Sequence, residues 1–308
     1  MIFINNKITD VYFNLSLEEY IFEKFKKDDI FIIWRNEPSV IIGKHQNLPQ
    51  EVNMKYCYDN KIKIARRISG GGTVFHDFGN VNYSYITDST GDTTTDFKEC
   101  LKPMYRVLKN LGIDISISER NDFRINDKKI CGHSQFVRKK RILHHGCILF
   151  DANLQDLRLS LDVKNRKFIC NCAKSVPSKV TNIKEICNFG FDSKKFLKKI
   201  ENEIYNNFDK ISLYELSDED IEKTQKLSEE KYSKKDWIYG QSPKSKLILD
   251  ENFGILDVNF GKITETYGDE ILKNFIGNYI ETGEILSVIN EKKLIVEKNY
   301  LIEKLINM

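Results

Sequence analysis

Three consecutive glycines, residues 70–72, constrain the fold of this chain more than any other feature of its sequence. Glycine permits a positive φ and carries no Cβ, so a ligand can lie directly against backbone N–H groups. Arg66 and Arg67 precede the glycines, and a guanidinium group can donate two parallel hydrogen bonds to a phosphate or a carboxylate. The stretch therefore indicates either a loop that binds an oxyanion or a glycine-rich hairpin in a structural sheet.

The glycine run differs from the two common phosphate-binding loops. No Lys-Ser or Lys-Thr pair follows it, as in a P-loop, and its spacing is not that of the G-x-G-x-x-G loop of dinucleotide-binding proteins. A β-branched and aromatic run follows the glycines instead. If the loop binds a ligand, a phosphate or an acyl phosphate fits this combination of arginines and bare backbone.

The composition limits the class of protein. The chain has 308 residues, a hydrophobic fraction of 41% and a formal net charge of +3. This length favours one large and one small domain with a packed core, and the near-balanced charge argues against a general nucleic-acid coat. Seven cysteines without a CxxC pair favour free thiols in a reducing compartment. Without a signal peptide or a membrane-spanning apolar run, we expect a cytoplasmic protein.

Periodicity predicts a mixture of helices and short strands. A capping-box pattern at Ser16 and Glu19 predicts a helix over 14–25, and apolar spacing predicts helices over 97–111 and 196–208. The strands predicted from apolar runs and alternation are 31–34, 39–43, 81–85, 113–117 and 144–151, with a hairpin that turns at 126–127. This pattern is typical of an α+β fold.

The composition changes at residues 215–235, which are charged, polar and poor in core residues. We expect a helical connector there. The division that this predicts is a large domain over 1–235, which includes the connector, and a small α/β domain over 236–308.

The stretch RRISGGGTVFHDFGN, residues 66–80, resembles the signature of lipoate–protein ligases. Further blocks with the same resemblance occur in order along nearly the whole chain: NLSLEEY, WRNEPSVIIGKHQN, ERNDF, NDKKICGHSQ, HHGCILFDANL, KSVPSKVTNI and DWIYGQSP. The resemblance implies the mixed-sheet catalytic fold of biotin and lipoate ligases with a C-terminal accessory domain. It also implies that ATP with Mg²⁺ activates lipoate, or octanoate, to an acyl-AMP, whose acyl group passes to a lysine of a carrier domain.

The resemblance also implies roles for individual residues. Lys129 matches the family's catalytic lysine, whose ammonium would neutralise a carboxylate and an α-phosphate as they approach each other. Without the resemblance, Lys129 would be interpreted as a surface lysine and Trp34 equally well as a core residue. The residues implied for ATP and the adenylate are Arg67, Gly72, Thr73, Val74, Phe75, Asp122, Lys129, Ser178 and Thr181. Those implied for lipoate are Trp34, Ser69, Gly71, Lys129 and His145, and Asp122 is the candidate for Mg²⁺.

Residues 174–181 match a loop that closes over the intermediate in the family. Pro177 departs from the family pattern and would stiffen this loop. The histidines lack the i,i+4 spacing of a zinc site, so we expect His76 and His145 to hydrogen-bond to backbone around the site.

Two alternatives remain open. A cysteine acyltransferase of the same fold would use a thiolate and no ATP, but SERNDFRIND lacks the cysteine, so Cys131 or Cys147 would have to act from another position. The second alternative is a non-catalytic relative that binds lipoyl carriers, although Arg67 and Lys129 argue against it.

The partners that the resemblance implies are apo lipoyl carriers, namely the glycine-cleavage H protein or E2 subunits of 2-oxoacid dehydrogenases. We expect no nucleic-acid or membrane partner, and we expect a monomer.

Overall fold

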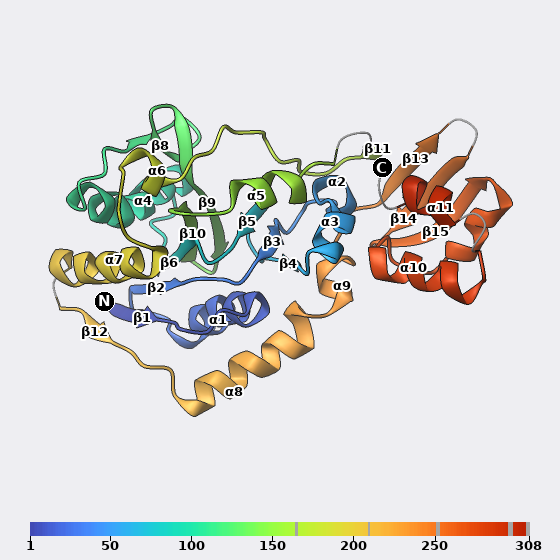
Figure 1. The fold of residues 1–308 in the computed structure, drawn as a ribbon. Helices are drawn as coiled ribbons and strands as arrows, with labels where there is room; N and C mark the ends of the chain where they lie inside the picture. The colour runs from blue at the N-terminus through green and yellow to red at the C-terminus, as the bar shows by residue number, and fades with distance from the viewer. Residues whose placement is uncertain (164–165, 209, 251–252, 295–297, 306–308) are drawn as a thin grey trace.

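The computed structural model describes residues 1–163, 166–208, 210–250, 253–294 and 298–305. These residues form an α+β fold with three sheets, as predicted (Figure 1). The largest sheet is mixed and has the strand order β12-β1-β2-β6-β10-β9-β8-β7. Its strands in chain order are β1 (Ile2–Asn5), β2 (Ile30–Trp34), β6 (Asn80–Asp88), β7 (Ser116–Ile117), β8 (Phe123–Ile125), β9 (Lys128–Arg138), β10 (Arg141–Leu149) and β12 (Ser212–Leu213).

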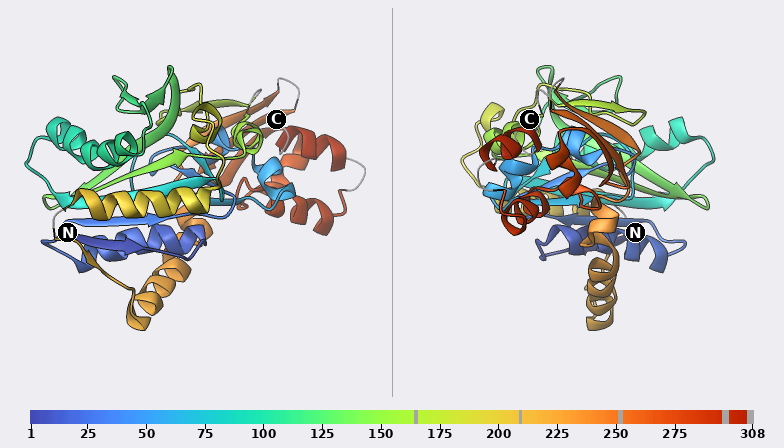
Figure 2. Two further views of the ribbon diagram at one scale, coloured as in Figure 1. Left: turned by 60° about the vertical axis from the view of Figure 1, so that its left-hand side comes forward. Right: turned by 90° about the vertical axis from the view of Figure 1, so that its right-hand side faces the viewer.

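Both faces of the large sheet are covered. Phe31 and Tyr83 project from one face into a core shared with α4 (Thr93–Asn110) and α7 (Ser193–Asn207). Figure 2 shows α7 lying along this side of the sheet. The next residue along β2, Ile32, projects from the other face and packs with α1 (Val11–Lys24). Because side chains alternate between the faces of a strand, the two faces carry separate cores.

A small three-stranded sheet lies over the α1 side of the large one. Its strand order is β4-β3-β5, with bounds β3 (Ser39–Ile42), β4 (Lys63–Arg66) and β5 (Val74–His76). Ile41 of β3 and Ala65 of β4 share a core with Ile32 and Trp34 of the large sheet. The glycine run joins β4 to β5, so it is a loop between two strands rather than the start of a helix.

The C-terminal part contains an antiparallel sheet with the order β11-β13-β14-β15. Its elements and the helices near it are β11 (Lys167–Cys170), β13 (Ser245–Asp250), β14 (Gly254–Asn259), β15 (Lys262–Gly268), the 3₁₀ helix η2 (Glu270–Phe275), α10 (Thr282–Glu291) and α11 (Lys298–Leu305). The edge strand β11 comes from the chain before the predicted connector and pairs with β13. The short helices that precede the predicted connector are α2 (Leu48–Glu51), α3 (Met54–Asp59), α5 (Leu154–Ser160) and α6 (Ile183–Ile186).

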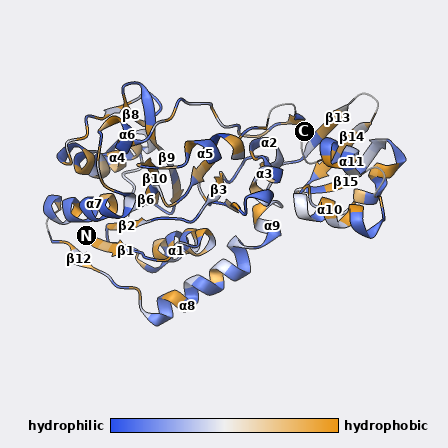
Figure 3. Cartoon of the chain, viewed as in Figure 1, coloured by the Kyte–Doolittle hydropathy of each residue, from blue (hydrophilic) through white to orange (hydrophobic). Residues whose placement is uncertain are grey.

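The predicted connector is helical. It contains α8 (Asp218–Leu227), the π-helical turn η1 (Ser228–Tyr232) and the start of α9 (Lys235–Ile238), and Figure 3 shows α8 to be mostly hydrophilic. The division into domains at residue 235 stays a prediction, and 164–165, 209, 251–252, 295–297 and 306–308 lie outside the described residues. None of the described helices is long and apolar enough to cross a membrane.

The predicted capping box at the first helix is wrong. The helix starts earlier, because the side chain of Asp10 accepts a hydrogen bond from the Phe13 N–H and caps α1. Ser16 lies inside the helix, where its hydroxyl donates to the carbonyl of Tyr12 at 2.7 Å. A serine inside a helix and a serine at its N-cap can give the same sequence pattern, and Glu19, three residues after Ser16, completed that pattern here.

The prediction of a strand over 113–117 is also wrong in its first part. The N–H of Ile113 donates to the carbonyl of Leu108 and that of Ile115 to the carbonyl of Ile113, so local bonds replace pairing with another strand. Both isoleucines are buried in the core beside α4 and α7. The other predicted elements are confirmed to within a few residues, including the hairpin, where Asn126 and Asp127 both have positive φ.

Arg66 is completely buried and connects the small sheet to the C-terminal part of the chain. Its guanidinium donates to three carbonyl oxygens within residues 43–46, to the carbonyl of Ile238 and to the hydroxyl of Ser242, at 2.8–3.1 Å. In return, Trp237 Nε1 donates to the Arg66 carbonyl at 2.7 Å. Burial lowers the pKa of Arg66 to about 9, which still leaves it charged at neutral pH.

We expect Arg66→Met to lower the free energy of unfolding by roughly 3 kcal/mol, because several buried carbonyl oxygens lose a charged donor. Urea unfolding of both proteins measures the change. Arg106, which is exposed on α4, supplies the control, since Arg106→Met should change the stability by less than about 0.5 kcal/mol. Equal effects of the two substitutions would contradict this role of Arg66.

Candidate active site

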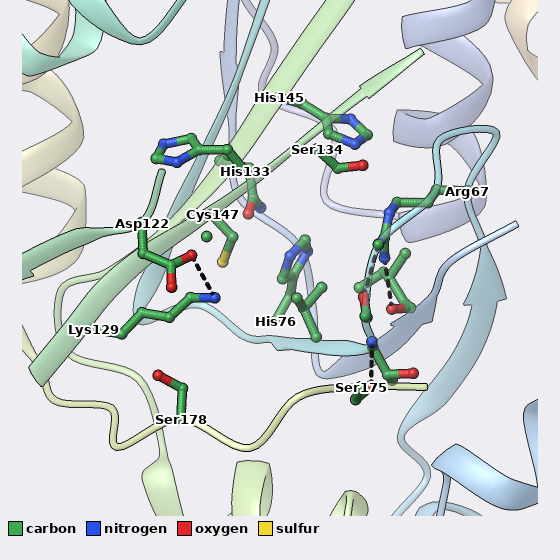
Figure 4. Close-up of a pocket in the computed structure, with 18 of the residues that line it drawn as sticks. Arg67, His76, Asp122, Lys129, His133, Ser134, His145, Cys147, Ser175 and Ser178 are labelled. Atoms are coloured by element: carbon green, nitrogen blue, oxygen red, sulfur yellow. Dashed lines mark hydrogen bonds and ion pairs between the residues drawn. The ribbon is translucent and has the colours of Figure 1, made fainter. Parts of the chain in front are cut away.

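A cavity of about 420 Å³ lies between the large sheet and the small one (Figure 4). One wall is a row of residues across four neighbouring strands: Trp34 on β2, Asn82 on β6, Cys147 on β10 and Gly132 on β9. Residues directly opposite each other in antiparallel strands project from the same face of the sheet, so all four residues of this row face the cavity. Residues of the glycine loop and β5 line the opposite wall.

Lys129 lies at the outer end of the cavity. Its ammonium forms an ion pair with Asp122 at 2.9 Å, which Figure 4 shows beside Cys147. A Cβ on Gly132 would lie only 2.6 Å from the Lys129 Nζ, so the glycine leaves the space that the ammonium occupies. The backbone of Lys129 is fixed by hydrogen bonds to the carbonyl of Lys179 and from the N–H of Thr181.

The outer end carries further positive charge. Arg120 and Lys174 are exposed residues that line the cavity together with Lys129. Among the described residues that line the cavity, the carboxylates are Asp122 here and Glu18 at the buried end. Positive charge at the entrance attracts a polyanion such as a triphosphate, while the deeper walls are mostly apolar.

The segment after β11 closes one side of the cavity. The hydroxyl of Ser175 accepts hydrogen bonds from the backbone N–H of Thr73 at 2.9 Å and from the side chain of Gln46 at 3.1 Å. The backbone N–H of Ser175 in turn donates to the carboxylate of Glu51. This segment therefore rests on the glycine loop in the structure, and its exposed Val176 forms part of the cavity entrance.

Arg67 holds the glycine loop in place. Its guanidinium donates to the carbonyl of Ile41 at 3.1 Å, to that of Gly70 at 2.5 Å and to that of Gly72 at 2.7 Å. Its Nε also donates to the hydroxyl of Ser69 at 3.0 Å. Burial lowers the pKa of Arg67 to about 10, so the group remains a cation beside the cavity.

A chain of side chains supports Arg67 from behind. The hydroxyl of Ser69 lies 2.7 Å from Nε2 of His145, and Nδ1 of His145 lies 2.8 Å from the carboxylate of Glu18. Because the carboxylate of Glu18 only accepts hydrogen bonds, Nδ1 of His145 donates to it, and Nε2 can then accept from the hydroxyl of Ser69. The hydroxyl of Ser84 also donates to Glu18.

The expectation that His76 and His145 hydrogen-bond to backbone is wrong. His145 bonds to side chains at both ring nitrogens, and Nδ1 of His76 lies 2.9 Å from the side-chain amide of Asn36. Both histidines lie against polar side chains from distant parts of the chain, and such partners cannot be identified from one sequence. Burial lowers the pKa of His76 to about 3, so its ring is neutral at pH 7.

The two cysteines that an acyltransferase would need are poor nucleophiles here. Burial raises the pKa of the Cys131 thiol well above its ordinary value, and burial also raises that of Cys147. A thiol with a raised pKa holds its proton at neutral pH and does not attack as a thiolate. The described residues also include no group of three or more histidine, cysteine, aspartate or glutamate side chains that could hold a metal ion.

Most residues that the resemblance implied line the cavity. These are Trp34, Arg67, Gly71, Gly72, Thr73, Val74, Asp122, Lys129, His145 and Ser178. Three others lie outside it. Phe75 is packed in the core, Ser69 lies behind Arg67, and Thr181 contributes its backbone N–H to the strand of Lys129.

Several cavity residues were missed from the sequence. Glu18, Asn36, Asn82 and Arg120 all line the cavity. Asn82 had a usable signal, because a polar residue between Val81 and Tyr83 on a strand marks the face opposite the core. The others come from a helix or loops, whose position depends on the tertiary fold.

Comparison with known proteins identifies the family. The catalytic-domain model of the lipoyl protein ligase A/B family matches residues 10–205. Lipoate-protein ligase LplJ of Bacillus subtilis (strain 168) is 34% identical over 97% of this chain and 91% of that protein. The crystal structure of lipoate-protein ligase A bound with ATP is 26% identical, with a TM-score of 0.64 over 76% of this chain and 96% of that one. An archaeal bipartite lipoate protein ligase, described with its E2 lipoyl domain from Thermoplasma acidophilum, is 25% identical with a TM-score of 0.65. The match covers 79% of this chain and 97% of that one.

The chain therefore belongs to the lipoyl protein ligase A/B family, and the prediction from its sequence blocks is confirmed. Within that family its relatives place it among the lipoate–protein ligases, which are enzymes, and the solved lipoate-protein ligase A has ATP bound. The fold agrees, because the structure of the solved lipoate-protein ligase A is similar to that of this chain over most of its length.

We expect Gly132→Ala to lower lipoate-dependent pyrophosphate release by about a hundredfold, because its Cβ displaces the Lys129 ammonium while the protein still folds. Gly190→Ala is the matched control, since a Cβ there meets no atom within 4 Å, and it should keep full activity. An active Gly132→Ala enzyme with an unchanged melting temperature would contradict the proposed packing.

The buried histidines predict that acid destabilises the fold. Burial lowers the pKa of His76 and of His133 to about 3 and that of His144 well below its ordinary value of 6.5. The unfolded chain takes up these protons near pH 6.5, whereas the folded chain takes them up only at much lower pH. The free energy of unfolding should therefore fall by up to about 4 kcal/mol per pH unit below pH 6.

Urea unfolding between pH 7 and pH 5 checks this slope. His144→Gln should reduce it by about a third, while His45→Gln, at an exposed position, should leave it unchanged. A stability that does not depend on pH in this range would show that the histidines are not buried in their neutral form.

Proposed function

We propose that this chain activates lipoate with ATP and then transfers the lipoyl group to a lysine of a carrier protein. The observation that carries the proposal is the position of Lys129, between a cationic entrance and a buried, mostly apolar interior. A molecule with an anionic head and an apolar tail fits this arrangement only with its charged end at Lys129. The lipoate carboxylate and the α-phosphate of ATP would meet there.

In the first step, a carboxylate oxygen of lipoate attacks the α-phosphorus of ATP and pyrophosphate leaves. The Lys129 ammonium reduces the repulsion between the two anions and stabilises the charge that builds up at phosphorus. In the second step, the amine of the carrier lysine attacks the acyl carbonyl, and AMP leaves with the bonding electrons. The same ammonium, close to the acyl–phosphate junction, favours this departure.

The residues for the nucleotide are at the entrance. The backbone of residues 72–74, at the end of the glycine loop and the start of β5, lies across the cavity from Lys129. Arg120, Lys174 and Ser178 can contact phosphate oxygens. Arg67 supports this site by fixing the carbonyl oxygens of the loop, and its charge adds to the field at the entrance.

Mg²⁺ fits this site as a companion of ATP. Magnesium is commonly held by one or two carboxylates together with substrate phosphates and water. Glu18 is already hydrogen-bonded to His145 and Ser84, so Asp122 is the cavity carboxylate that could hold the ion. When bound, Mg²⁺ would neutralise charge on the phosphates and favour the departure of pyrophosphate.

The acceptor is proposed to be a lysine on an apo lipoyl domain, such as an E2 subunit or the H protein. The archaeal relative that is described with its E2 lipoyl domain supports this class of partner. We further propose that residues 236–308 form an accessory domain, and that the enzyme acts as a cytoplasmic monomer.

The test compares Lys129→Ala with Lys128→Ala. Lys128 is the adjacent residue, is exposed and does not line the cavity. Pyrophosphate release with lipoate and Mg·ATP should fall about a thousandfold in the first variant and stay at the wild-type rate in the second. No release by the wild-type enzyme, or an active Lys129→Ala variant, would contradict the proposed function.

A further inference from the structure

The buried end of the cavity carries polar groups that an apolar tail would leave without partners. Nε1 of Trp34, Nε2 of His76 and both amide atoms of Asn82 are buried and have no hydrogen-bond partner among the described residues. All three residues line the cavity, and Asn82 is only 1% exposed. Buried polar groups in folded proteins are nearly always hydrogen-bonded, so three together at the wall of one cavity call for an explanation.

Trp34 and His76 each present an N–H donor, and the amide of Asn82 presents N–H donors as well. An indole nitrogen can only donate, and Nδ1 of His76 accepts from the Asn36 amide, which leaves the ring proton on Nε2. The amide of Asn82 carries two further N–H groups. The buried end therefore presents N–H groups to whatever molecule fills the cavity.

The position of Asn82 matches the far end of a bound acyl chain. Trp34, Asn82, Cys147 and Gly132 are direct neighbours across four strands, and the ammonium of Lys129 lies beside Gly132. Neighbouring strands are about 4.8 Å apart, so Asn82 lies roughly 10 Å from the Lys129 end of the row. That distance is close to the extended length of an eight-carbon acyl chain.

We propose that Asn82, together with Trp34, selects acyl substrates whose tail accepts hydrogen bonds, and thereby makes lipoate a better substrate than octanoate. This inference rests on the proposed function. The dithiolane sulfurs of lipoate are weak acceptors for N–H groups. The tail of octanoate is a plain hydrocarbon, which expels water from the cavity and leaves the amide and the indole N–H unpaired.

The experiment measures pyrophosphate release with lipoate and with octanoate and compares the two kcat/KM values. Asn82→Leu keeps the branched arrangement of the side-chain heavy atoms and removes the amide, and it should lower the lipoate-to-octanoate ratio about tenfold relative to the wild type. Its melting temperature should not fall, because an unpaired buried amide has been replaced by an apolar group.

Asn5→Leu is the matched control. Asn5 also has a buried amide without a partner among the described residues, but it pairs with Ile33, whose side chain packs on the opposite face of the large sheet. This variant should leave the ratio unchanged. Trp34→Phe removes the indole N–H and should lower the lipoate-to-octanoate ratio by a smaller factor. This variant tests the inference independently if Asn82→Leu does not fold.

The outcomes separate this inference from the proposed function. A wild-type enzyme that releases no pyrophosphate with either acid would overturn both. A wild-type enzyme that uses both acids equally well would overturn the selection by Asn82 alone. The same holds if Asn82→Leu and Trp34→Phe lower both rates by the same factor. A fall in the ratio that is confined to these two variants supports the inference.

Discussion

Hydrogen bonds from two buried guanidinium groups to backbone carbonyls hold the active site together. The glycine loop has no side chains of its own to pack, so its conformation has to be fixed from outside. Arg67 binds the carbonyl oxygens of Gly70 and Gly72, and Arg66 binds the neighbouring turn at residues 43–46. Charged donors make stronger hydrogen bonds than neutral ones, which suits arginine to this task.

The role of Arg66 and Arg67 in the structure differs from the one expected from the sequence. The sequence suggested that both could bind the oxygens of a ligand. In the structure, the nitrogens of Arg66 and Arg67 donate to the protein itself, and Arg66 reaches Ile238 and Ser242 in the C-terminal part. The loop that would bind the nucleotide and the first residues after the connector are therefore linked through one side chain. If the C-terminal part moved relative to the cavity, either these hydrogen bonds would break or the turn at residues 43–46 would move with it.

The cavity combines two environments because it lies between two sheets. Its outer end is formed by the β8–β9 hairpin and the segment after β11, where cations such as Lys129 and Lys174 are partly in contact with solvent. Its inner end is formed by the buried faces of β2 and β6, which place Trp34 and Asn82 away from solvent. An amphipathic substrate is therefore oriented before any chemistry takes place.

The sequence predicted those parts of the structure that local pattern determines. The amphipathic helices, the 126–127 hairpin and the residues of the glycine loop followed from periodicity, turn chemistry and the family resemblance. The role of Glu18 did not follow, since its partner His145 lies on a strand far away in the chain and the contact exists only after folding. The origin of β11 was missed for the same reason, because pairing with β13 depends on the tertiary fold.

The most direct test of this account is a crystal structure of the chain with lipoyl-AMP bound. The account predicts the Lys129 Nζ within about 3.2 Å of an oxygen at the acyl–phosphate junction, with the dithiolane ring beside Trp34 and Asn82. An acyl chain that lies outside the cavity, or an ammonium that remains on Asp122 away from the junction, would contradict it.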